Sequence, residues 1–135
     1  MKDKVVIFWF RRDLRLEDNV GLQQAVVSGY PVLPIFIFDS DILEKLEVKQ
    51  DRRVDYIYQV LDAMNSVLHT HGSTLYIDYG KPLAIFKTII ALYDVQGVYC
   101  NRDYEPQAIK RDELIDSYLK DQGIQFNTYK DQVIF

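Results

Sequence analysis

The residue types best suited to chemistry in this sequence gather in two charged loops, residues 10–18 and 101–106. The first loop holds three arginines beside three acids. These charges could satisfy one another in a salt-bridged turn, an arrangement that adds little stability. Alternatively, the arginines could form a docking surface for a ligand or a second domain, because a guanidinium fork suits planar polar groups. The residue types alone leave both interpretations open.

The elements that must position these loops follow from the alternation of apolar runs with helical patterns. Strand-like runs predict five strands, at residues 5–10, 32–38, 74–78, 97–101 and 124–129. Helical patterns lie between them, at residues 19–28, 50–71, 82–93 and 106–122. Residues 40–49 are predicted to form a loop with a short helical turn at residues 42–46. This order predicts an α/β fold with a five-stranded parallel sheet of order 3-2-1-4-5 and helices on both faces, either Rossmann-like or flavodoxin-like.

Ligands of an open parallel sheet bind beyond the carboxyl ends of its strands, at the point where the strand order reverses. Here that point lies between the first and fourth strands, where the two charged loops face each other. The predicted ligand-binding residues combine apolar walls, arginines and polar acceptors: Phe10, Arg11, Ile37, Phe38, Asp39, Arg53, Asn101, Asp103 and Glu105. In a rival interpretation, Asp103 and Glu105 only pair with arginines and cap the helix that begins at Pro106. The candidate arginines are Arg11, Arg12 and Arg111.

Other familiar sites are excluded. No glycine-rich phosphate loop follows the first strand, and Gly80-Lys81 is only a dipeptide. His69 and His71 are two residues apart and do not share a helix face, so we predict no metal site. Cys100 ends an apolar strand and is interpreted as a small buried hydrophobic residue. No nucleophile and base can be paired, and we therefore predict no catalytic residue.

Composition narrows the class of protein. Hydrophobic residues make up 48% of the 135 residues, which argues against disorder. The formal net charge of −4 argues against a chain that binds nucleic acid over its whole surface. A single cysteine forbids an internal disulfide, and no apolar run approaches the length of a membrane span. The simplest prediction is a cytoplasmic protein.

The two charged loops also carry a family resemblance. Residues 8–19, FWFRRDLRLEDN, resemble the opening signature of the DNA photolyase and cryptochrome family. Residues 101–112, NRDYEPQAIKRD, resemble its second signature, and the likeness extends over the whole chain. Further matching positions are residues 37–39, Arg53 and residues 131–135.

This resemblance implies a two-domain parent protein. Residues 1–135 would be its N-terminal α/β domain, which holds a light-harvesting antenna chromophore, either a deazaflavin or a methenyl folate. A helical domain that binds FAD and damaged DNA would be absent, and the apolar end at residues 133–135 agrees weakly with a shortened chain. The resemblance thus implies part of a deoxyribodipyrimidine photolyase, a carbon–carbon lyase for light-driven DNA repair. The fragment alone is expected to be inactive, with that helical domain as its partner.

Two alternatives and one departure accompany this interpretation. A cryptochrome photoreceptor would share the fold, and a free-standing flavodoxin-like nucleotide-binding module is the competitor from another class. Family members that use a folate have polar residues after the Tyr-Glu pair, where this chain has Pro106, Gln107 and Ala108. Only Gln107 offers a comparable hydrogen bond, so a deazaflavin or flavin antenna is favoured over a folate, or no antenna is present.

Overall fold

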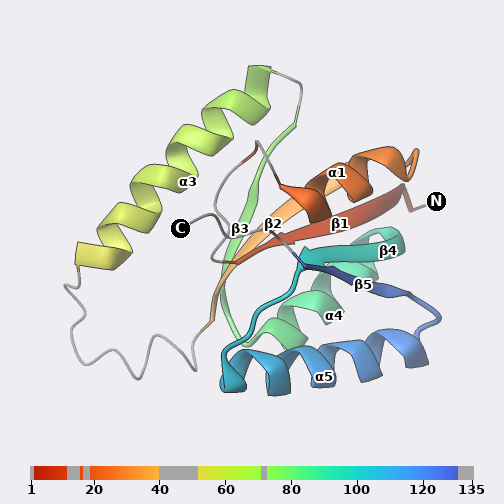
Figure 1. The fold of residues 1–135 in the computed structure, drawn as a ribbon. Helices are drawn as coiled ribbons and strands as arrows, with labels where there is room; N and C mark the ends of the chain where they lie inside the picture. Colours follow the sequence, from red (N-terminus) through yellow and green to blue (C-terminus); the bar gives the residue numbers. More distant parts are fainter. Residues whose placement is uncertain (1, 12–15, 17–18, 40–51, 71–72, 131–135) are drawn as a thin grey trace.

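The computed structural model describes residues 2–11, 16, 19–39, 52–70 and 73–130, and for residues 52–56 only the main chain. Strands and helices alternate along these residues (Figure 1). They are β1 (Lys4–Phe10), α1 (Val20–Val27), β2 (Val32–Asp39), α3 (Arg52–Thr70), β3 (Tyr76–Gly80), α4 (Pro82–Leu92), β4 (Asp94–Asn101), α5 (Pro106–Asp121) and β5 (Phe126–Tyr129). None of the described helices is long and apolar enough to cross a membrane.

The five strands form one parallel sheet of order β3-β2-β1-β4-β5, which confirms the predicted fold and strand order. Strand β1 is central and pairs with β2 on one side and β4 on the other. Helices α1 and α3 pack on one face of the sheet, and α4 and α5 cover the opposite face (Figure 1). This arrangement brings the ends of β1 and β4 together at the carboxyl edge.

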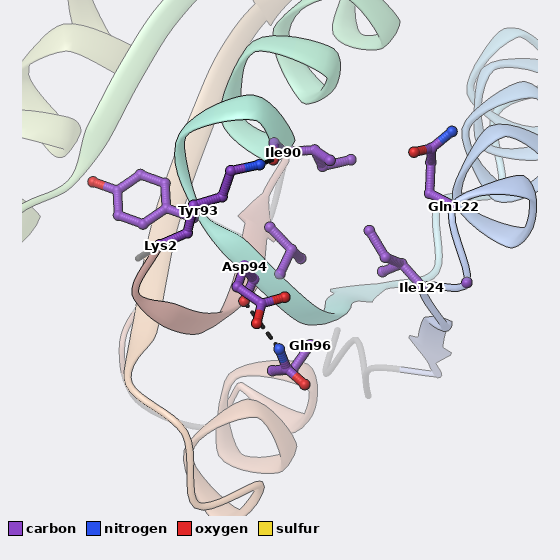
Figure 2. A pocket seen from close by; sticks show the side chains of 9 residues that line it. Lys2, Ile90, Tyr93, Asp94, Gln96, Gln122 and Ile124 are labelled. Carbon is purple, nitrogen blue, oxygen red and sulfur yellow. Dashed lines mark hydrogen bonds between the residues drawn. The ribbon is translucent and has the colours of Figure 1, made fainter.

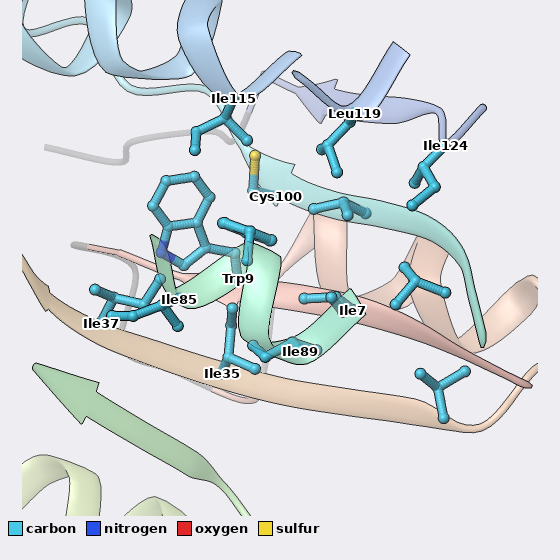
Figure 3. Packing of buried hydrophobic residues seen from close by; sticks show 14 residues of the cluster. Ile7, Trp9, Ile35, Ile37, Ile85, Ile89, Cys100, Ile115, Leu119 and Ile124 are labelled. Carbon is cyan, nitrogen blue, oxygen red and sulfur yellow. The ribbon is translucent and has the colours of Figure 1, made fainter. Parts of the chain in front are cut away.

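The pleat divides the core into two clusters. Side chains of Ile7, Trp9 and Ile37 face α4 and α5, where they pack with Ile89 and Leu119 (Figure 3). The alternate residues of the same strands face α1 and α3, in a cluster that includes Val6, Phe8, Phe10, Phe36 and Phe38. Neighbouring residues in a strand therefore serve opposite faces, as expected from the two-residue period of a strand.

Some element boundaries differ from the predictions. Strand β3 begins at Tyr76, two residues later than expected, because the main-chain N–H of Leu75 donates instead to Oδ1 of Asn65 in α3, at 3.0 Å. Pro34 lies inside β2, and β3 pairs with β2 only from Ile35 onward, so no ladder bond to β3 is required at the proline. The predicted loop at residues 40–49, its helical turn at residues 42–46 and the start of the long helix at Gln50 lie outside the described residues.

Candidate functional site

Arg11, the first residue after β1, ties together three elements at the carboxyl edge. Its Nη1 donates to both carboxylate oxygens of Asp112 in α5, at 2.6 and 2.5 Å, and its Nη2 donates to the main-chain oxygen of Asn101. The side chains of Arg11 and Asp112 are only 6% and 14% exposed. Burial by itself lowers the pKa of Arg11, but the charges of Cys100 (when ionised), Asp112 and Asp103 outweigh it, so the pKa is raised. Arg11 therefore stays a permanent cation that joins β1, β4 and α5.

Asn101, at the end of β4, holds the beginning of α1. Its Nδ2 donates to Oδ1 of Asn19 at 2.6 Å, and its Oδ1 accepts the main-chain N–H of Gly21 at 2.8 Å. Asn19 in turn caps α1 by accepting the N–H of Leu22 at 3.1 Å. Gly21 allows this close approach, since an added Cβ would lie 2.9 Å from the Phe8 ring. The carboxamide of Asn101 thus faces α1 and positions that helix against the sheet.

Trp9 lies at the centre of the charged cluster on the α4–α5 face. The guanidinium carbons of Arg11 and Arg111 lie 5.0 and 4.8 Å from its ring centroid, at cation–π distance. Trp9 is only 2% exposed and packs edge-on against Phe86. A buried indole with two cations beside it is an unusual concentration of planar groups, and it lies below the predicted ligand-binding edge.

Arg111, in the second turn of α5, contacts one acid at the end of β2 and another just after β4. Its Nε donates to Oδ1 of Asp112 at 3.4 Å, and its Nη1 lies 3.5 Å from Oδ2 of Asp39. Its Nη2 lies 3.9 Å from Oδ2 of Asp103, is buried, and has no hydrogen-bond partner in the described structure. Arg111 therefore gathers Asp39, Asp103 and Asp112 around one cation, at long contact distances.

The predicted site residues occupy both faces of the sheet. Phe10 and Phe38 face α1 and α3, whereas Ile37 faces α4 and α5. A planar ligand lying against one face would contact only part of this set, and contact with all three requires a position beyond the strand ends. The side chain of Arg53 lies outside the described residues.

The acids near α5 match part of the rival interpretation. Asp103 forms the ion pair with Arg111 and also accepts the main-chain N–H of Glu105 through Oδ1, at 3.1 Å. Glu105 is the N-cap residue of α5, but its side chain makes no capping hydrogen bond and is exposed to solvent. Of the two acids, Glu105 is therefore the one that is accessible in this structure. Whether either acid binds a ligand remains a prediction.

Sequence reasoning missed Trp9 and Asp112, and it named Arg111 only as a possible ion-pair partner of Asp103 or Glu105. The signal was present in part, because Trp9 and Arg11 are two residues apart and a strand places such residues on the same face. Arg111 and Asp112 end the second motif, but only the structure shows that they lie between the two loops.

Metal-ligand clusters and surface cavities are two other features that could mark a site. Among the residues that the structure describes, no group of three or more His, Cys, Asp or Glu side chains is arranged to hold a metal ion. A cavity of about 310 Å³ lies at the opposite, amino edge of the sheet, where Lys2, Asp94, Gln96 and Ile124 contribute to its walls (Figure 2). Because this cavity lies at the other end of the strands, it is separate from the switch point.

Comparison with known proteins identifies a consistent group of relatives. Residues 6–135 match the family described as DNA photolyase. A deoxyribodipyrimidine photo-lyase from Synechococcus is 31% identical over 96% of this chain, which spans 26% of that relative. The curated relatives matched first are thus much longer, with 26% to 45% of their length covered.

Solved structures agree with this assignment. A class III photolyase from Agrobacterium tumefaciens superimposes with a TM-score of 0.81 at 29% identity, over 96% of this chain and 26% of its own. A photolyase from Sulfolobus tokodaii gives a TM-score of 0.80 at 32% identity, over 95% of this chain and 29% of its own. That structure is described as containing two FAD molecules, with the implication of a novel light-harvesting cofactor.

Proposed function

We propose, from the premise that this chain belongs to the DNA photolyase family, that it serves as the N-terminal chromophore-holding domain of a deoxyribodipyrimidine photolyase. The observation that carries the proposal is the match over residues 6–135 to the DNA photolyase family, together with two solved photolyases that share this fold. The whole reaction would be the light-driven repair of pyrimidine dimers in DNA. Within residues 1–135 we assign no catalytic residue to that reaction.

The partner in this proposal is a helical domain that binds FAD. The relatives extend well beyond the matched region, which agrees with a second domain in those proteins. The net charge of −4 supports assigning DNA contact to that partner, because binding to a phosphate backbone requires a basic surface. We place the protein in the cytoplasm, where a single buried cysteine remains reduced.

The carboxyl edge of the sheet fits an antenna chromophore of the flavin or deazaflavin type. Apolar strand ends, a guanidinium with an unsatisfied N–H and several acids meet there, and this is the usual composition of a ligand pocket. When bound, such a group would absorb light and pass the excitation energy to the flavin of the partner domain. The Sulfolobus tokodaii structure with two FAD molecules supports this class. Gln107 is the only polar side chain at the three positions where folate-binding members have polar contacts.

Different residues of this chain would make different contacts with the chromophore. Phe10, Ile37 and Phe38 would supply apolar contacts at the strand ends, with Arg53 approaching from α3. Asp39, Asp103 and Glu105 would accept hydrogen bonds from N–H or hydroxyl groups of the ring. Arg11 and Asn101 would act as positioning residues, because their polar groups hold α5 and α1 in place.

Ligand titration tests the assignment. We expect the unmodified chain to bind flavin mononucleotide or 8-hydroxy-5-deazariboflavin saturably, and methenyltetrahydrofolate more weakly. Fluorescence anisotropy of the flavin or deazaflavin reports binding, and Asp103→Ala and Glu105→Ala should weaken it. Asp116→Ala is a matched control, since Asp116 is an acid further along α5 that pairs only with the exposed Lys120 among the contacts described. If none of the three compounds binds saturably to the unmodified chain, the antenna assignment is wrong.

A further inference from the structure

The two arginines beside Trp9 differ in how many of their N–H groups reach a hydrogen-bond acceptor. Arg11 makes close contacts with both oxygens of Asp112 and with the carbonyl of Asn101. Arg111 makes one long hydrogen bond through Nε, and its Nη2 is buried without a hydrogen-bond partner in the described structure. The two guanidinium groups lie over the same indole, so their surroundings differ mainly in the acceptors they reach.

An unsatisfied N–H of this kind calls for a physical explanation. Buried donors in folded proteins are almost always paired, and the exceptions are often explained by a function or by a missing water or ion. The acids around Arg111 balance its charge, but their distances of 3.5 and 3.9 Å are too long for good hydrogen bonds. The site therefore supplies neutralising charge to Arg111 and leaves both N–H bonds of Nη2 without an acceptor.

We infer that Arg111 is a specificity-determining residue that donates a hydrogen bond to an acceptor group of the antenna chromophore, a ring carbonyl, phenolate or phosphate. This inference rests on the function proposed above. Because Nη2 is covered in this structure, the guanidinium must turn toward the carboxyl edge to meet the ligand. The long contacts of Arg111 to Asp39 and Asp103 oppose that movement only weakly. Arg11, by contrast, is held in place by its close contacts with Asp112.

The matching chemical class is a planar heterocycle with an acceptor on its edge. A guanidinium fork is planar and rigid and suits such an acceptor better than the single ammonium group of a lysine. The neighbouring acids then accept hydrogen bonds from the ring, while Arg111 supplies the donor. The structure thus assigns Arg111 a role that Asp39, Asp103 and Glu105 cannot fill, since ionised carboxylates only accept hydrogen bonds.

Two substitutions separate the fork from the charge. Arg111→Lys keeps the positive charge and removes the fork, and Arg111→Gln removes both. We expect flavin mononucleotide and 8-hydroxy-5-deazariboflavin to bind about tenfold more weakly to the lysine variant and about a hundredfold more weakly to the glutamine variant. Lys110→Gln is the control, because it removes one positive charge from the adjacent, exposed position of the same helix.

The urea midpoint of the ligand-free variants distinguishes binding from structure. We expect Arg111→Lys to lower this midpoint only slightly, because lysine keeps the positive charge and the hydrogen bond that it loses, from Nε to Asp112, is long at 3.4 Å. Unchanged affinity in both Arg111 variants would overturn the inference and leave the proposed function standing. The inference would also be overturned if each variant lost binding free energy and free energy of unfolding by the same amount. That result would indicate a structural role for Arg111. Failure of the unmodified chain to bind either compound would refute the proposed function itself.

Discussion

Replacing Asp112 by alanine should destabilise the protein more than any exposed charge substitution. The carboxylate of Asp112 accepts two hydrogen bonds from Nη1 of Arg11 and one from Nε of Arg111. Both guanidinium groups are largely buried, with side-chain exposures of 6% for Arg11 and 15% for Arg111. Without Asp112, the buried charge of Arg11 keeps the carbonyl of Asn101 but loses its nearest described anion.

The size of the effect follows from this geometry. Removing one partner of a buried ion pair destabilises a protein by about 3–5 kcal/mol, because the remaining charge is left uncompensated. In this variant Arg11 keeps its hydrogen bond to the carbonyl of Asn101 and its contact with the Trp9 ring. We therefore expect the lower end of that range, about 3 kcal/mol. For a domain of this size, such a loss lowers the melting temperature by roughly 10 °C.

Urea unfolding followed by far-ultraviolet circular dichroism measures the difference directly. Asp116→Ala is the matched control, because its carboxylate lies 3.9 Å from the exposed Lys120 on the same helix and should contribute less than about 0.5 kcal/mol. Replacing both members of the buried pair, Arg11→Met with Asp112→Leu, should recover most of the stability. If the free energies of unfolding of Asp112→Ala and the Asp116→Ala control differ by less than about 1 kcal/mol, the contribution assigned to this ion pair is wrong.

Two further outcomes are expected. Gly21→Ala should lower the urea midpoint, because the added Cβ would lie 2.8 Å from Oδ1 of Asn101. Alanine favours helices more than glycine does, so an unchanged or higher midpoint would contradict the close packing at this position. The pKa of Tyr76 is raised by burial and by the charge and hydrogen bond of Asp78, so the folded chain holds this proton more tightly than the unfolded chain. Its contribution to stability is therefore complete below the unfolded pKa of about 10 and is lost as the pH rises through the folded value. Tyr76→Phe should flatten the alkaline decline of the unfolding free energy, and an identical decline in both proteins would count against this contribution.

The fold was predictable because its signals are local and repeat along the chain. A continuous apolar run such as residues 5–10 identifies a strand buried on both faces, and right-handed crossovers leave few sheet orders to consider. One exception arose where a single side chain decides the pairing, since Asn65 takes the N–H of Leu75 and delays the start of β3. Such a contact between a helix and a distant segment leaves no periodic trace in the sequence.

The site was predictable in its location and less so in its internal contacts. Topology places the two loops at the switch point, and the structure brings Arg11, Asn101 and Asp103 to that edge. Which polar group meets which partner depends on the pleat and on the direction of long side chains. For this reason the close pair Arg11–Asp112 and the position of Arg111 over Trp9 emerged only from the structure.

The central place of β1 has a consequence for how the chain is made. This strand is synthesised first, yet one of its two neighbours is β4, and the contact of Arg11 with Asp112 joins residues 101 positions apart. Until β4 leaves the ribosome, the apolar run of β1 has only half of its final sheet environment. Closing so long a loop is slow, and exposed apolar strands aggregate during the wait. The nascent chain should therefore depend on chaperones until almost all of the domain has been translated.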